Sequence, residues 1–361
     1  MQTVRGRGNM IRAGLIGFGL GGRVFHAPLL SSVEGIELAA IVERTSNLAG
    51  ERYPGITTYR TLDAMLADRS LDLIVITTPN DSHFEYARQC LEAGKNVVVD
   101  KPMCVTSAEV AELITLAAAK GLLLAPFHSR RFDSDFLTLK KLLHDAPLGR
   151  LVYFESTMDR WRPAPTARMP WKNDPAQGGL LLDLGTHLAD QPLALFGLPE
   201  GIDAEIKRER DGEGANDSFT IRLRYPDLTV VVSANTLSTI ERPRYHVRGT
   251  RGNYLKTGID PQEAALSKIT RIPDGPWGTE PTSAWGTLCV DVDGGTVTRP
   301  IQPIPGDYRL FYAAVRDAIL GKAPVPIAAV DAWRVARLLE YAAESSEQRC
   351  EIVCDWSEEP R

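Results

Sequence analysis

The segment "GGLLLDLGTHLADQPLALFG" places an aspartate and a histidine at a spacing that suits proton transfer. Asp183 and His187 are four residues apart, so on a helix they lie one turn apart on the same face. A histidine beside a carboxylate can accept a proton near neutral pH, because its ordinary pKa is about 6.5. The pair indicates a general base. One alternative is a polar pair on a helix surface. Another is a metal site that uses His187 with Asp190 and Gln191, but a single histidine without a nearby cysteine predicts no metal.

The stretch "GLIGFGLGG" near the start of the chain has the spacing of a cradle for dinucleotide phosphates. Gly17, Gly19 and Gly22 follow the apolar run "MIRAGLI", which predicts a buried strand. Glycines let the backbone approach a pyrophosphate closely, and the N-terminus of the following helix offers it unpaired N–H groups. The spacing alone also fits a flexible apolar turn, so the neighbouring elements must distinguish a phosphate cradle from such a turn.

The elements after the glycines complete a dinucleotide-binding pattern. The second predicted strand, "IELAAIVE", ends at Glu43, where such a fold places the carboxylate that binds the adenosine ribose. Short apolar runs then alternate with amphipathic ones, which predicts a parallel sheet with helices on both faces. Ligands bind at the carboxyl ends of such strands. The residues predicted at these ends are Thr77, Thr78, Pro79, Asn80, Asp100, Lys101 and Pro102.

Beyond about residue 130 the pattern becomes that of an antiparallel sheet. Segments such as "SFTIRLRYP" and "LTVVVSANTLST" alternate polar and apolar residues between turns. We therefore predict an α/β chain of two domains. Residues 1–130 form a doubly wound, Rossmann-type dinucleotide-binding domain, and residues 131–361 form an α+β substrate-binding domain with a large, mainly antiparallel open sheet. Apolar residues on the outer face of that sheet predict a homodimer or homotetramer.

Composition excludes several classes of protein. The chain has 361 residues, a net charge of -5 and 43% hydrophobic residues, which predicts no nucleic-acid partner and no basic membrane-binding surface. No apolar run approaches the ~20 residues that a membrane span needs, and the arginine-containing N-terminus lacks a signal-peptide pattern. The five cysteines are odd in number and scattered, so we expect a reducing, cytoplasmic location. Cys350 and Cys354 have no further ligands near them in the sequence, which favours ordinary packing.

Five segments, in order, resemble the Gfo/Idh/MocA oxidoreductases, the glucose-fructose oxidoreductase and inositol dehydrogenase family. They are "GLIGFGLGGRVFHAP", "ITTPNDSHFEYARQCLEAGKNVVVDKP", "RRFDSDF", "GGLLLDLGTHLADQPLALFGLP" and "GTRGNYLKTGIDPQE", and the similarity runs over essentially the whole chain. It implies an NAD- or NADP-dependent enzyme that moves a hydride between nicotinamide and a secondary alcohol or ketone of a sugar or cyclitol. NAD-dependent glycosidases and catalytically silent regulators that sense cofactor or sugar also occur in the family, so both stay as alternatives.

The resemblance also implies roles for individual residues. Lys101 matches the lysine of the family's E-K-P motif, and Asp183 and His187 match its D-x-x-x-H pair. It implies that His187 is the general base, that Asp183 holds substrate and histidine, and that Lys101 polarises the reacting hydroxyl. It further implies a cis bond between Lys101 and Pro102. The implied substrate-binding residues are Lys101, Arg131, Trp161, Arg162, Asp183 and His187. For Arg131, Trp161 and Arg162, packing or salt bridges are the alternative roles. The implied cofactor-binding residues are Gly17, Gly19, Gly22, Glu43, Arg44, Thr78, Pro79, Asn80, His83, Asp100 and Lys101.

Three positions depart from the family pattern. Asp100 stands where glutamate is usual, and Ser129 stands where asparagine usually precedes the paired arginines. Glu43 and Arg44 stand where the NADP-dependent relatives tend to carry Ser-Arg. A carboxylate at the ribose repels a 2′-phosphate, whereas an arginine attracts it. The sequence therefore predicts a preference for NAD and leaves NADP open.

Overall fold

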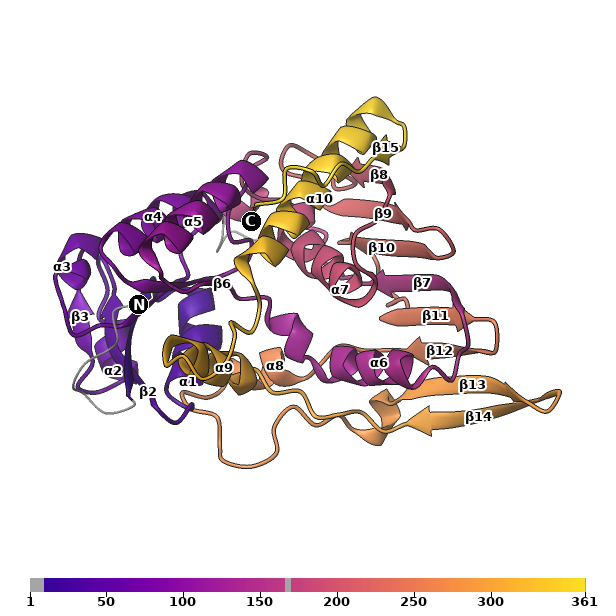
Figure 1. The fold of residues 1–361 in the computed structure, drawn as a ribbon, viewed down its shortest axis with the longest axis horizontal. Helices are drawn as coiled ribbons and strands as arrows, with labels where there is room; N and C mark the ends of the chain where they lie inside the picture. The colour runs from indigo at the N-terminus through magenta and orange to yellow at the C-terminus, as the bar shows by residue number, and fades with distance from the viewer. Residues whose placement is uncertain (1–9, 166–169, 361) are drawn as a thin grey trace.

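The computed structural model describes residues 10–165 and 170–360, and two β-sheets dominate it (Figure 1). The first sheet lies in the N-terminal part of the chain, and the second, larger sheet is built from later strands. Helices α6, α7 and α10 lie on the face of the second sheet that is turned toward the first domain (Figure 1). Among the helices of the described residues, none is long and apolar enough to cross a membrane.

The first sheet has six parallel strands in the order β3-β2-β1-β4-β5-β6. Its strands are β1 (Ile11–Ile16), β2 (Ile36–Val42), β3 (Thr57–Tyr59), β4 (Leu73–Ile76), β5 (Asn96–Val99) and β6 (Leu124–Pro126). The helices between them are α1 (Ala27–Leu30), α2 (Leu48–Arg52), α3 (Leu62–Leu66), α4 (His83–Glu92) and α5 (Ser107–Lys120). The strand order reverses between β1 and β4, which confirms the predicted doubly wound Rossmann fold.

Burial explains why these segments form strands and helices. All four residues of β4 are buried leucine, isoleucine or valine, because helices cover both faces of a doubly wound sheet. Helix α5 begins at a capping box of Thr106 and Glu109 and ends at Gly121, whose φ is +63°. Both helix ends therefore have partners for their free backbone groups.

The second sheet has nine strands in the order β14-β13-β12-β11-β7-β10-β9-β8-β15. They are β7 (Leu151–Thr157), β8 (Gly201–Lys207), β9 (Ser218–Arg224), β10 (Thr229–Asn235), β11 (Tyr245–Gly249), β12 (Gly252–Lys256), β13 (Gly286–Val292), β14 (Gly295–Ile301) and β15 (Ile352–Val353). Neighbouring strands pair antiparallel except β7 and β10, which pair parallel. The prediction of a mainly antiparallel sheet is confirmed.

Five α-helices follow β6 in the described part of the chain. They are α6 (Ser134–Asp145), α7 (Thr186–Phe196), α8 (Gln262–Leu266), α9 (Arg309–Ile319) and α10 (Ala329–Gln348). Helix α9 does not pack on the second sheet: its Phe311 and Tyr312 stack against Phe127 in the core of the first domain. The predicted boundary at residue 130 separates the two sheets, but the chain crosses back to complete the first domain.

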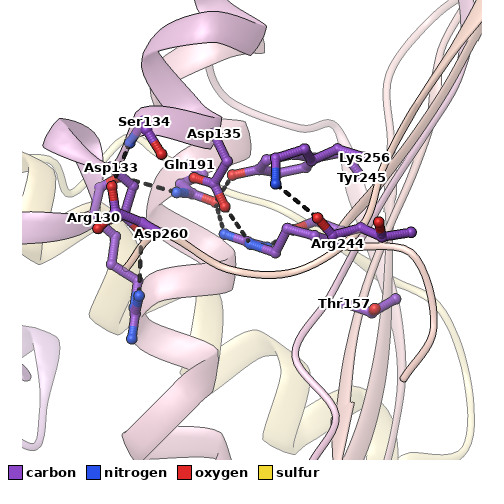
Figure 2. A network of polar contacts seen from close by, with 12 residues as sticks. Arg130, Asp133, Ser134, Asp135, Thr157, Gln191, Arg244, Tyr245, Lys256 and Asp260 are labelled. Atoms are coloured by element: carbon purple, nitrogen blue, oxygen red, sulfur yellow. Dashed lines mark hydrogen bonds and ion pairs between the residues drawn. The ribbon is translucent and has the colours of Figure 1, made fainter. Parts of the chain in front are cut away.

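A buried ionic network joins α6 and α7 to the second sheet (Figure 2). Arg244, which immediately precedes β11, is 1% exposed. Its Nη2 donates to Gln191 Oε1 at 2.7 Å, and its Nε lies 3.3 Å from Asp135 Oδ2. Gln191 in turn donates to the carbonyl oxygen of Arg130 at 3.2 Å. The network therefore ties the helix that carries His187 to the sheet behind it.

Candidate active site

The glycine loop after β1 leaves room for a phosphate group. Gly17 has a φ of +92°, and a Cβ on Gly22 would lie 2.1 Å from the carbonyl oxygen of Gly17, so both positions require glycine. A Cβ on Gly19 would meet nothing within 4 Å. Thr77, at the end of β4, donates to the carbonyl oxygens of Ile16 at 3.0 Å and Gly17 at 2.8 Å, which holds the loop in place.

A cleft of about 1130 Å³ extends from this loop along the ends of the strands. Its lining residues include Gly17, Gly19, Glu43, Arg44, Thr78 and Pro79. The close backbone approach at the glycines and the size of the cleft fit a nicotinamide dinucleotide. These predicted cofactor residues are therefore brought together.

Glu43 lines the cleft, but its carboxylate is engaged by helix α2. Its Oε1 accepts from the backbone N–H of Leu48 at 3.2 Å and from the hydroxyl of Ser46, and its Oε2 accepts from the N–H of Ala49 at 3.1 Å. The side chain therefore caps the start of α2, where the helix dipole favours negative charge. Arg44 is exposed in the same cleft. The predicted preference for NAD rests on the charge of this carboxylate, and the three donors occupy part of its hydrogen-bonding capacity.

The other predicted residues at the strand ends lie around a second cavity, of about 230 Å³, which borders the first. Asn80, His83 and Asp100 line it. Both ring nitrogens of His83 lie 2.8 Å from backbone carbonyl oxygens, those of Pro102 and Thr78. His83 therefore ties the ends of β4 and β5 together rather than presenting a free nitrogen to the cofactor. The implied cis bond between Lys101 and Pro102 is confirmed.

Asp100 has a partner that suits its shorter side chain. The Nε2 atom of His26 lies 3.6 Å from Asp100 Oδ2, and Tyr312 contacts the other ring nitrogen of His26 at 2.6 Å. Asp100 Oδ1 accepts from the backbone N–H of Lys101 at 2.8 Å. Burial raises the pKa of Asp100, but the contact with His26 and the charge of Lys101 outweigh it and lower the pKa overall. Asp100 is thereby held as a carboxylate at the start of the Lys101 segment.

The two domains meet at a lysine–aspartate pair. Lys101 follows β5, and Asp183 lies in the wide helical turn Leu181–Gly185 that leads into α7. Lys101 Nζ donates to Asp183 Oδ1 at 2.8 Å and to its carbonyl oxygen at 2.7 Å. Lys172 Nζ donates to the same Oδ1 at 2.9 Å, and Arg160 Nη1 lies 3.6 Å from Oδ2. Burial raises the pKa of Asp183, but these three cations outweigh it and hold the pKa well below its usual range.

His187 lines the cavity on the first turn of α7 and is 7% exposed. The predicted pairing of its ring with Asp183 does not form: Nδ1 of His187 has no hydrogen-bond partner among the described residues. The turn that contains Asp183 is wider than an α-helix, so residues four apart no longer stack directly. Burial lowers the pKa of His187 well below its usual value, and the charges of Lys101 and Arg130 lower it further. The imidazole is therefore neutral at pH 7, as a general base requires.

The predicted sugar-binding residues separate in the structure. Arg131 forms a two-pronged ion pair with Asp190, at 2.6 and 2.9 Å, and another ion pair with Asp331, so its guanidinium is committed away from the cavity. Trp161 is 56% exposed and is not among the described residues that line the cavity. Arg162 does line it, at the border with the cofactor cleft.

The cavity contains four charged residues that the sequence prediction missed: Arg130, Arg160, Lys172 and Glu263. The predicted Arg162 was a usable signal for Arg160. Trp161, between them, forms an isolated bridge with Leu237 beyond the end of β7, and residues two apart in an extended chain share one side. No comparable signal marked Lys172, which stands in the short helical turn Pro170–Asn173.

A dinucleotide cleft that adjoins a lysine, an aspartate and a histidine is the arrangement of an NAD(P)-binding oxidoreductase. Two family descriptions match the chain: the NAD-binding Rossmann fold of the oxidoreductase family over residues 11–128, and the C-terminal alpha/beta domain of that family over residues 140–353. The chain therefore belongs to the Gfo/Idh/MocA oxidoreductase family.

Individual relatives cover nearly the full length. The uncharacterized oxidoreductase YdgJ of Escherichia coli is 41% identical over 343 residues, which span 95% of this chain and 98% of YdgJ. The scyllo-inositol 2-dehydrogenase (NADP(+)) IolW of Bacillus subtilis is 32% identical over 345 residues, 96% of each chain. The solved structure of YPO2259 from Yersinia pestis superposes with a TM-score of 0.90 at 41% identity and covers 96% of this chain and 97% of its own.

Proposed function

We propose that this protein oxidises a secondary alcohol of a sugar or cyclitol, or reduces the matching ketone, by hydride exchange with a nicotinamide cofactor. The observation that carries the proposal is that Lys101, Asp183 and His187 line one cavity beside the dinucleotide cleft. When bound, the cofactor supplies the hydride acceptor or donor. The name of the relative IolW, a scyllo-inositol dehydrogenase, supports the same class of substrate.

The protein's own residues accept and return the proton of the reacting hydroxyl. As the hydride leaves the carbon, the O–H bond breaks, its electron pair forms the carbonyl, and His187 accepts the proton. Lys101 donates a hydrogen bond to the reacting oxygen and stabilises its developing negative charge. Asp183 holds the Lys101 ammonium in place. Reduction uses the same groups in the opposite direction.

The cofactor is NAD or NADP, and the predicted preference for NAD stays a prediction. Arg44 and Thr45 line the cleft next to Glu43, so groups that bind a 2′-phosphate are available. The scattered cysteines support activity in a reducing compartment such as the cytoplasm.

The test is a panel of inositols and aldoses, incubated with NAD or NADP while nicotinamide absorbance is followed. We expect reduction of the cofactor with at least one polyol. Release of a sugar from a glycoside without net NADH would instead support the glycosidase alternative. Binding of cofactor and sugar without hydride transfer to any member of the panel would support the regulator.

A further inference from the structure

The cavity contains a second lysine to which the proposed chemistry assigns no task. Lys172 lies in the helical turn Pro170–Asn173, and its Nζ contacts Asp183 Oδ1, the oxygen that Lys101 also contacts. Two ammonium groups from different domains therefore meet at one carboxylate oxygen.

The geometry limits how far apart the two ammonium groups can be. Because Lys101 Nζ lies 2.8 Å and Lys172 Nζ 2.9 Å from the same oxygen, their separation cannot exceed the sum of these distances. Two adjacent hydroxyl oxygens of a polyol ring are closer together than that. Each ammonium group can therefore donate to one oxygen of the same adjacent pair.

Both lysines retain N–H donors that can bind substrate oxygens. An ammonium group has three N–H donors. Lys101 uses two of them on Asp183, and Lys172 uses one. Within residues 10–165 and 170–360 the remaining N–H groups have no protein acceptor. Lys172 lines the same cavity as His187, so its free donors are available to a substrate there.

The charge balance of the cavity favours oxygen-rich ligands at this point. Lys101, Lys172 and Arg160 surround the single carboxylate of Asp183. Burial lowers the pKa of Lys172, and the charges of Lys101 and Arg160 add to this, while Asp183 opposes it. Partly dehydrated cations gain free energy when substrate oxygens replace the water they have lost.

We propose that Lys172 binds the oxygen adjacent to the reacting one, so that the substrate presents two neighbouring oxygens, as in a vicinal diol or an α-hydroxy ketone. The inference rests on the proposed function, in which Lys101 holds the reacting oxygen. Lys172 is then a substrate-binding residue that selects diols over simple alcohols.

The test compares trans-cyclohexane-1,2-diol, in which each hydroxyl has a neighbour, with cyclohexanol, which has none. Because the diol gains a hydrogen bond from a charged donor, kcat/KM of the wild-type protein should be about 10- to 100-fold higher for the diol than for cyclohexanol. Lys172→Met should remove most of this preference, because it should lower kcat/KM for the diol far more than kcat/KM for cyclohexanol. Lys172→Arg, which keeps the charge, should restore part of the preference. Lys141→Met, on an exposed lysine of α6, is the matched control and should change neither value.

Binding of NADH, followed by its fluorescence, checks that each variant is folded. An equal loss on both alcohols, or an unchanged preference in Lys172→Met, overturns the proposal. If no alcohol is turned over, the role of Lys172 can be tested separately from the proposed function. Calorimetry then measures how tightly each alcohol binds to the complex of the protein with NADH. Tighter binding of the diol that disappears in Lys172→Met would keep the role of Lys172 while the proposed function fails. Equal binding of the two alcohols overturns the proposal.

Discussion

The ammonium group of Lys101 donates hydrogen bonds to two oxygens of Asp183, the carboxylate Oδ1 at 2.8 Å and the carbonyl oxygen at 2.7 Å. The residues lie 82 positions apart and belong to different domains. Their contact therefore joins the two domains and holds the ammonium group at the cavity that His187 also lines.

The imidazole of His187 should titrate below the ordinary histidine pKa of about 6.5. Burial and the charge of Lys101 both disfavour the imidazolium, so Lys101→Met should move the titration upward. NMR of the histidine ring across pH measures both midpoints. Because the unfolded chain binds this proton at a higher pH than the folded chain, His187 should also make unfolding easier as the pH falls below about 6.5. A wild-type midpoint above that value contradicts the account.

Arg44→Ala should lower kcat/KM with NADP by about 10-fold or more and leave the value with NAD nearly unchanged, because a guanidinium interacts strongly with a 2′-phosphate. Steady-state kinetics with both cofactors provides the measurement. Glu43→Gln is the companion variant: it removes the charge at the start of α2 and should cost about 1 kcal/mol of stability. Equal losses with both cofactors in Arg44→Ala would show that Arg44 does not contact the 2′ position.

Arg244→Met should lower the free energy of unfolding by about 3–5 kcal/mol, because it leaves the buried carboxylate of Asp135 without its cation. Guanidinium chloride unfolding measures the change. Arg224→Met is the control, since that arginine pairs with Glu200 and Glu351 on the surface, and its loss should leave stability unchanged. Similar stability of the two variants would mean that the network in Figure 2 contributes little.

We propose that the protein forms a homo-oligomer through the face of the second sheet opposite α7. In Figure 1 no helix of the described residues covers this face, and Tyr153, Val231 and Leu255 alternate along their strands with buried neighbours that point inward. Light scattering at micromolar concentration should give a dimer or tetramer mass. Leu255→Asp should shift the mass toward the monomer. A monomer mass for the wild-type protein would rule out this interface.

The fold and the central residues were predictable because their signals are local. The glycine spacing, the apolar strands and the D-x-x-x-H pair are short patterns tied to backbone geometry, and the structure brings Gly17, Lys101, Asp183 and His187 to adjoining cavities. The short elements β3 and α2, of three and five residues, are too brief to show a periodicity.

The roles of the remaining site residues could not be predicted, because they depend on contacts that sequence spacing does not encode. Of the paired arginines, Arg131 was predicted for the substrate, yet it is held by Asp190 and Asp331, and Arg130 lines the cavity instead. The capping role of Glu43 depends on where α2 begins. The position of Lys172 beside Asp183 depends on how the chain folds between these two residues of the second domain.

Turnover by Lys101→Met and His187→Ala tests the central claim, that hydride transfer occurs where these residues meet Asp183. Each substitution should lower kcat by about 10²- to 10⁴-fold on the best substrate of the panel, because each removes a group that stabilises or accepts charge during the reaction. Binding of NADH should stay unchanged, since the phosphate contacts belong to the glycine loop. The double variant should fall little below the slower single variant, as groups that act as a unit are not additive. Near-normal kcat in both single variants would contradict the account.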